Sequence, residues 1–167
     1  MSKRTVLYLL LVSILLVSTF VIIYLHTLQN IREGLMDTLK TLDIYSVNTL
    51  LNGNLVIMNV SIELENKAKY TVTVDSIQMK VYVDNIHVGS ANPYNQPISF
   101  DVAPGEKCII FFTCPSINRN IMEILNRDSY VICGNGTVKG HASYYFITVS
   151  HVQLFNIMKT ISKGVKP

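Results

Sequence analysis

The sequence lacks the short motifs that mark the common catalytic and nucleotide-binding sites. It contains no G-x-S-x-G nucleophile elbow, no phosphate-binding G-x-x-x-x-G-K-[ST] loop and no H-E-x-x-H helix. Glu63 and Glu65 alternate on one side of an expected strand, and a solvated face explains this pair better than catalysis does. The histidines are scattered, with no second ligand at metal-site spacing; they are His26, His87, His141 and His151. We therefore expect no enzyme, no metal site and no cofactor.

Charge is also scarce, and its two signs are mixed. Charged residues form 15% of the 167 residues, and the net charge is only +3. Nucleic-acid binding needs a basic stripe or a platform of basic and aromatic residues, and neither is present. Nucleic acid is therefore not an expected partner, and the length suits about one domain.

Residues 5–25 contain no charge at all and read TVLYLLLVSILLVSTFVIIYL. A helix of this length rises by about 30 Å, which is enough to span a bilayer. The alternative is a cleaved signal peptide, but no small-residue cleavage site follows the segment. Lys3 and Arg4 precede the segment directly, so the positive-inside bias predicts a cytoplasmic N-terminus at residues 1–4 and an exported remainder.

Residues 26–42 carry an apolar stripe with helical spacing, which predicts an amphipathic stalk. The stripe can pack on the chain's own domain or form a coiled-coil seam between copies, so oligomerisation through residues 5–42 is a second interpretation. Gly34 interrupts the pattern and could mark a hinge. The stripe consists of Leu28, Ile31, Leu35, Leu39 and Leu42.

The hydrophobic period changes to two at Asp43, which predicts the start of a β domain over residues 43–157. Residues 55–64 and 77–83 alternate between apolar and polar positions, and Asp84-Asn85 suits a tight hairpin turn. Residues 98–102 alternate before Pro104-Gly105, and residues 107–114 are apolar on both faces. The pattern predicts an all-β antiparallel two-layer sandwich of the immunoglobulin or fibronectin kind, with seven or eight strands.

One short helix is expected after Pro115-Ser116, with Ser116 as cap and an apolar face formed by Ile117, Ile121, Ile124 and Leu125. It should be about three turns long. Strands are expected again at residues 129–133, 138–149 and 151–155, with a turn at residues 134–136. Residues 158–167 have little to bury and are expected to form a basic, frayed tail.

The β region also resembles a known family. The segments VSIELENKAKYTVTVDSIQMKVYVDNIHVGSA, ISFDVAPGEKCIIFFTC and YVICGNGTVKG are similar to the late-embryogenesis-abundant type 2 domain, also called the water-stress and hypersensitive-response (WHy) domain. Asn66, residues 81–84, Val88-Gly89 and residues 102–105 occupy positions of its pattern. The resemblance covers residues 42–157. It implies a membrane-anchored domain with a stress-associated binding role and no established catalysis.

Two tripeptides match the N-glycosylation sequon. They are Asn59-Val60-Ser61 and Asn135-Gly136-Thr137. Asn135 is the preferred acceptor because its neighbours predict a turn, whereas Asn59 falls within a strand. Both lie in the part that is expected outside the cell.

Three cysteines in an exported domain leave one thiol over. Cys108 and Cys114 lie too far apart on one strand to bridge, at roughly 20 Å. If the strand that ends at Cys133 lies antiparallel beside residues 107–114, Cys108–Cys133 is the expected disulfide. Three buried free thiols are an equally good alternative.

Aromatic residues provide the best candidates for recognition. Tyr82, Tyr94, Tyr144 and Tyr145 fall on edges, loops or mixed faces, although tyrosine also packs in ordinary cores. Two functions follow: a membrane-tethered binding module for a surface polymer, a lipid or an envelope protein, or an accessory subunit of a larger surface assembly.

Overall fold

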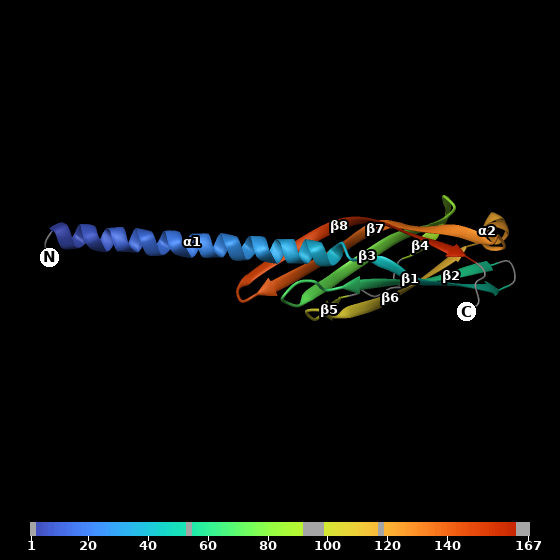
Figure 1. Cartoon of the computed structure of the whole chain (residues 1–167), viewed down its shortest axis with the longest axis horizontal. Coiled ribbons are helices and arrows are strands. Elements are labelled where there is room, and N and C mark those ends of the chain that lie inside the picture. Colours follow the sequence, from blue (N-terminus) through green and yellow to red (C-terminus); the bar gives the residue numbers. More distant parts are fainter. Residues whose placement is uncertain (1–2, 53–54, 92–98, 117–118, 163–167) are drawn as a thin grey trace.

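The computed structural model describes residues 3–52, 55–91, 99–116 and 119–162. It consists of one long helix followed by two antiparallel sheets (Figure 1). The three-stranded sheet has the order β1-β2-β6, and the five-stranded sheet has the order β4-β3-β7-β8 with β5 paired to β3. The elements are α1 (Lys3–Leu39), β1 (Asp43–Asn52), β2 (Leu55–Glu65), β3 (Val72–Val83), β4 (Ile86–Ala91), β5 (Phe100–Val102), β6 (Lys107–Ser116), α2 (Arg119–Leu125), β7 (Ser129–Tyr144) and β8 (Ile147–Ser162). The predicted all-β sandwich with a long N-terminal helix is confirmed.

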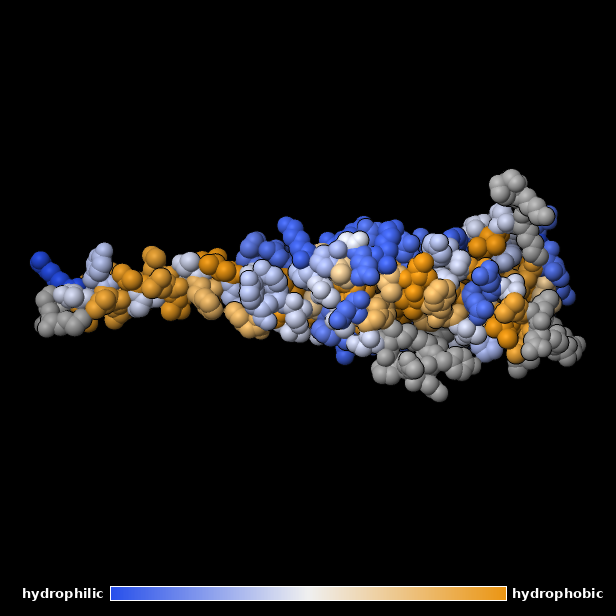
Figure 2. Space-filling view, turned by 90° about the horizontal axis from the view of Figure 1, so that it is seen from below, coloured by the Kyte–Doolittle hydropathy of each residue, from blue (hydrophilic) through white to orange (hydrophobic). Residues whose placement is uncertain are grey.

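The N-terminal part of α1 is long and apolar enough to cross a membrane. Its side chains are exposed from Val6 to Leu25. Figure 2 shows this part as a mostly hydrophobic rod that projects from a mixed surface. Its length and composition are those of a segment that can lie in the hydrocarbon of a bilayer.

The C-terminal part of α1 belongs to the domain core. The helix continues without interruption to Leu39, and the side chains of Ile31, Leu35 and Leu39 are fully buried. Leu35 and Leu39 approach Gly140 on β7, so this end of the helix lies against the five-stranded sheet. Of the two interpretations of the stripe, the structure therefore shows the one in which it packs on its own domain.

Tyr70 and Asn66 fasten the helix to the sheets. Tyr70 Oη donates to the main-chain oxygen of Ile31 at 2.5 Å, and this ring reaches the helix through the space over Gly34. Asn66 is fully buried, and its Oδ1 accepts from Thr38 Oγ1 at 3.0 Å. Gly34 is therefore a contact site for Tyr70 within an unbroken helix, and the hinge interpretation is wrong.

The inner faces of the sheets follow the predicted alternation. On β2 the buried set is Val56, Met58, Val60, Ile62 and Leu64, and on β3 it is Ile77, Met79, Val81 and Val83. The β3–β4 turn also lies where the sequence predicts it. Asp84 and Asn85 take φ angles of 45° and 67°, as a two-residue hairpin turn requires.

Several predicted boundaries are wrong. β6 continues through Pro115 to Ser116, which pairs with Val56, so Ser116 belongs to the strand. Proline is tolerated there because β6 is an edge strand. α2 begins at Arg119 and has only seven residues; Ile121, Ile124 and Leu125 are buried, and Ile117 lies outside the described residues.

The second half of the domain forms one long hairpin. β7 passes straight through residues 134–136, where a turn was predicted, and the actual turn is at Tyr145-Phe146. β8 then continues to Ser162, so the predicted tail is ordered strand for its first five residues. Lys159 Nζ holds it against β1 by donating to the main-chain oxygens of Ile44 and Tyr45 at 2.9 and 2.6 Å.

Candidate binding groove on the five-stranded sheet

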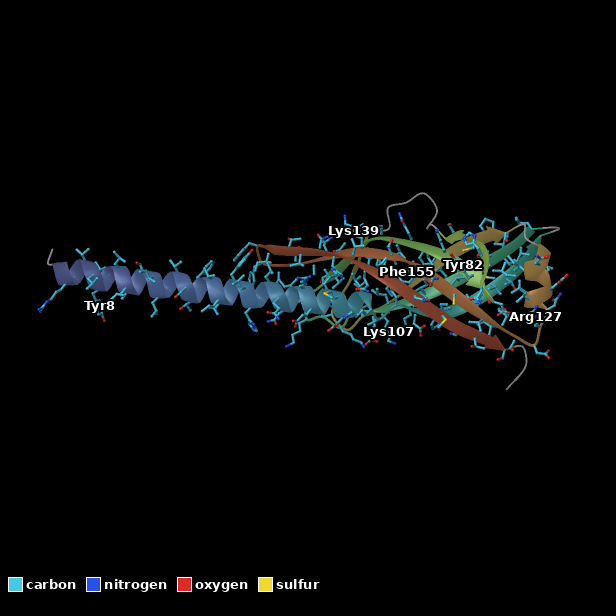
Figure 3. All side chains as sticks on the ribbon, turned by 90° about the horizontal axis from the view of Figure 1, so that it is seen from above. Tyr8, Tyr82, Lys107, Arg127, Lys139 and Phe155 are labelled. Carbon is cyan, nitrogen blue, oxygen red and sulfur yellow. The ribbon has the colours of Figure 1, made fainter. Side chains whose placement is uncertain are left out.

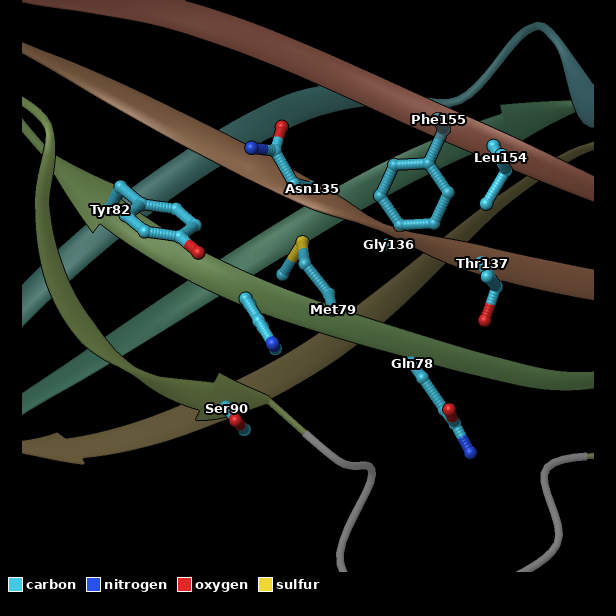
Figure 4. A pocket seen from close by; sticks show the side chains of 10 residues that line it. Gln78, Met79, Tyr82, Ser90, Asn135, Gly136, Thr137, Leu154 and Phe155 are labelled. Carbon is cyan, nitrogen blue, oxygen red and sulfur yellow. The ribbon is translucent and has the colours of Figure 1, made fainter.

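An open groove of about 610 Å³ lies on the five-stranded sheet, over β3, β7 and β8. Figure 3 labels Tyr82 and Phe155 beside each other on the β domain. In the close-up, the two rings stand on either side of Asn135, Met79 and Gly136 (Figure 4). The lining residues are Gln78, Met79, Lys80, Tyr82, Ser90, Asn135, Gly136, Thr137, Leu154 and Phe155.

Strand register brings the polar lining side chains together. Alternation on β3 puts Gln78, Lys80 and Tyr82 on the face opposite the buried Ile77, Met79 and Val81. β7 pairs with β3 so that Thr137 lies opposite Gln78 and Asn135 lies opposite Lys80. Two short cross-strand rows of polar side chains therefore form the floor of the groove.

Gly136 allows the strands and one ring to approach closely. A Cβ at this position would overlap the main-chain oxygen of Gln78, and it would lie only 2.9 Å from Phe155 Cζ. Any larger residue would push β7 away from β3 or displace the ring. Gly136 therefore shapes the groove between β3 and β8.

The groove offers hydrogen bonds and aromatic surface. Its polar lining side chains are amides, hydroxyls and the ammonium of Lys80; no Asp, Glu, His or Cys is among its described lining residues. Tyr82 also packs against His87, with ring centroids 5.2 Å apart. Such a surface can hold a ligand that has both an apolar face and hydroxyl groups.

The other predicted candidates lie apart from this groove. His141 Nδ1 lies 2.8 Å from Asp75 Oδ1, and Glu63 forms an ion pair of 2.7 Å with Lys107. In the described part of the chain, no three His, Cys, Asp or Glu residues gather in a way that could hold a metal ion. Tyr144 and Tyr145 are exposed at the β7–β8 turn, and Tyr94 lies outside the described residues.

Both sequon asparagines lie within strands. Asn135 is exposed and lines the groove, but it belongs to β7 and pairs with Lys80, so the turn that favoured it is absent. Asn59 is half-buried in the central strand of the other sheet, and its Oδ1 accepts from Thr113 Oγ1 at 3.0 Å. Exposure still favours Asn135 as the acceptor, and its glycosylation stays a prediction.

The expected Cys108–Cys133 disulfide is wrong, because its strands are not neighbours. β6 pairs with β2, whereas β7 pairs with β3 and β8 in the other sheet. Cys108 shares the inward side of β6 with Ile110, but Cys133 lies on the side of β7 opposite the buried Ile132. All three thiols are free, and burial raises the pKa of Cys114 to about 11.

Sequence patterns did not indicate the groove. Gly134-Asn135-Gly136 was interpreted as a turn because glycine and asparagine commonly form turns. One signal for a continuous strand was available, because the apolar alternation has the same phase before and after the glycines. The buried residues that share this inward face are Tyr130, Ile132, Val138 and Ala142. The register between β3 and β7 has no sequence signature.

Comparisons with known proteins show no family. No family model matches the chain, and no curated protein matches it. Solved structures show a distant likeness. A protein from Archaeoglobus fulgidus has 11% identity and a TM-score of 0.38, with 74% of this chain and 100% of that chain covered. A protein described as ApaA from Bordetella pertussis has 13% identity and a TM-score of 0.42, with 70% and 90% covered.

Proposed function

We propose that this chain is a membrane-anchored, non-enzymatic binding protein whose groove faces the outside of the cell. The observation that carries the proposal is the single unbroken helix α1, which joins an exposed apolar rod to the core of a domain with an open groove. A protein built in this way holds a recognition surface at a fixed place beside a membrane.

The orientation follows from the flanks of the helix. Lys3 and Arg4 directly precede the apolar segment, and positive residues favour the cytoplasmic side. The domain is then exported. Protease added to intact cells should remove the domain and spare the N-terminus, whereas a fully protected domain would contradict this orientation.

The ligand that suits the groove is a hydroxyl-rich polymer of the cell surface, such as a neutral polysaccharide. Its sugar rings have apolar faces that can pack on Tyr82 and Leu154, and their hydroxyls can bond to Gln78, Asn135 and Thr137. No carboxylate is among the described lining residues, so the ammonium group of Lys80 can also pair with an anionic substituent on the polymer. An open groove suits a polymer, which continues beyond both ends.

The test uses the full chain in mild detergent and immobilised polysaccharides, for example a β-glucan and a mannan. Tyr82→Ala should weaken retention about tenfold, because an aromatic contact is worth about 1.4 kcal/mol. Tyr45→Ala is the matched control, since Tyr45 is exposed on β1 outside the groove. Equal effects of the two variants, or no retention of the parent protein, would contradict a polysaccharide ligand.

A second function, as an accessory subunit, is favoured by β8. This 16-residue strand is at the sheet edge and pairs only with β7 within the described residues, and Val152, Leu154 and Met158 are exposed along it. Such an edge can accept a strand from a partner. Sizing after mild detergent extraction should then reveal a stoichiometric partner.

The stress-associated role implied by the family resemblance is part of the first proposal, the membrane-anchored binding protein.

A further inference from the structure

The turn of the β7–β8 hairpin lies beside the exposed part of α1, on the side of the domain that faces the N-terminus (Figure 1). Tyr144 pairs with Ile147, so Tyr145 and Phe146 form a two-residue turn. The side chains of Tyr145 and Phe146 are 86% and 76% exposed. A soluble domain gains nothing from two large exposed rings at a turn.

These rings contact the membrane-spanning part of the chain. Phe146 stacks on Tyr24 with a centroid separation of 6.5 Å and an interplanar angle of 7°. The turn and the helix enclose an apolar hollow of about 310 Å³, which is lined on the helix side by Phe20, Ile23, Tyr24 and Thr27. The hairpin turn is therefore at the same level as the outer end of the apolar segment.

That level corresponds to the border between acyl chains and headgroups. The uncharged segment ends at Leu25, one residue beyond Tyr24, and Phe20 is about 6 Å deeper at 1.5 Å per residue. Headgroups occupy roughly 5–8 Å on each side of the hydrocarbon core. A span that is centred in the bilayer consequently places Phe146 at this border.

The turn is also suited to enter that layer. Residues 142–150 carry no charge, so no ion has to leave water. Strand pairing satisfies the main chain up to Tyr144 and Ile147, which leaves few open polar groups. Tyrosine is enriched at membrane interfaces because its ring is apolar and its hydroxyl is polar.

The backbone of Tyr145 supports a role for its side chain. Its φ angle is 53°, in the left-handed region where glycine or asparagine is normally preferred at a hairpin turn. A tyrosine at this position costs conformational energy in the folded chain. A ring that is exposed only to water gives no stabilising contact to offset this conformational energy.

We propose that the β7–β8 turn inserts into the outer border of the bilayer and forms a second membrane contact beside α1. This inference rests on the proposed membrane anchor. The occupant of the apolar hollow is lipid, because the hollow is continuous with the spanning part of α1. With two contacts, the domain has one fixed orientation above the membrane.

The absence of tryptophan from the natural chain makes the test direct. Single-tryptophan variants of the full chain are placed in lipid nanodiscs, and fluorescence is measured with lipids brominated near the headgroup end and with aqueous iodide. The reporter is Phe146→Trp, with Tyr145→Trp as a second reporter should the first variant fold poorly. Phe111→Trp is the matched control, because Phe111 is 75% exposed on the other sheet. Leu15→Trp reports on the middle of the span.

For Phe146→Trp we expect emission at shorter wavelength, loss of emission with brominated lipid and little loss with iodide. Phe111→Trp should show the reverse. Iodide quenching of Phe146→Trp equal to that of Phe111→Trp would overturn the insertion, while lipid quenching of Leu15→Trp would leave the anchor standing. Protection of Phe146→Trp from both quenchers would indicate a protein occupant and also overturn it. A Leu15→Trp signal that lipid does not quench would overturn the anchor itself.

Discussion

The hydroxyl of Tyr70 lies directly over Gly34, and this pair joins the membrane helix to the β domain. The hydroxyl donates to the Ile31 oxygen at 2.5 Å, with the Asn30 oxygen 3.0 Å away. A methyl group at position 34 would overlap Tyr70 Oη and lie 3.1 Å from its Cζ. The contact therefore ties the helix to the domain at this point.

Gly34→Ala should therefore destabilise the protein, by about 1–2 kcal/mol, although alanine favours a helix by about 1 kcal/mol over glycine. Tyr70→Phe removes the overlapping oxygen. In that background Gly34→Ala should cost less, because the contacts that remain, 3.1 Å to the ring Cζ and 3.2 Å to Ala68 Cβ, need only small shifts. Thermal unfolding of the four members of this cycle measures the coupling, and purely additive effects would contradict the contact.

Asn66 should be among the most sensitive polar residues. Its Nδ2 donates to the main-chain oxygens of Tyr70 and Val102 at 2.9 and 2.8 Å, and its Oδ1 accepts from the Ala68 amide at 2.8 Å. Asn66→Ala leaves these groups buried without partners and should cost about 3–5 kcal/mol. The control is Asn135→Ala, at an exposed asparagine, which should change the unfolding free energy by less than about 0.5 kcal/mol. Similar losses in chemical unfolding would refute this difference.

A chain that begins at Asp43 should not fold stably. It would lack Ile31, Leu35 and Leu39, each of which is fully buried, and each loss of a large side chain typically costs about 2–5 kcal/mol. The sum reaches the whole stability of an ordinary domain, about 5–15 kcal/mol. A chain that begins at Thr27 keeps these residues and should melt cooperatively. Equal melting of the two chains would show that the helix adds nothing to the core.

The three thiols should react at different rates in the native protein. Cys114 is fully buried and has a pKa of about 11, so at pH 8 only about one molecule in a thousand carries its thiolate. Cys108 and Cys133 are both partly exposed, but burial and the nearby Glu106 raise the pKa of Cys108, so Cys133 should be alkylated first. Peptide mapping after timed alkylation checks this order, and all three thiols should react after denaturation. A thiol that stays blocked without reductant would indicate a disulfide.

The sequence predicts best those parts of the fold in which one face is buried. The alternations on β2 and β3 predicted the correct inward sides. When one face of a sheet is buried, every second residue of the strand is apolar, and this period can be recognised in the sequence. The stripe on α1 gave its buried face for the same reason. These signals are local and need no knowledge of the partner strand.

The β7–β8 turn and the groove were not predictable in the same way. Gly136 allows β7 to approach β3 closely and does not form a turn. Tyr145-Phe146 does form a turn, although neither residue type is common in turns. Residue preferences therefore predicted the turn at the wrong position. The groove needs Lys80 and Asn135 side by side, although 55 positions separate them in the chain. Only the register of β3 against β7 brings them together, and the sequence carries no local signal for it.

The rigid junction at Gly34 also sets how far the protein can reach. From Tyr144 to Asn135 is nine residues, or about 30 Å along β7 at roughly 3.3 Å per residue. A receptor on a flexible tether samples a volume, whereas the proposed anchor and inserted turn would hold this groove in a thin layer at a nearly constant height over the bilayer. In that arrangement a ligand would have to extend into the layer, and binding would depend on the distance of the ligand from the membrane as much as on its chemistry.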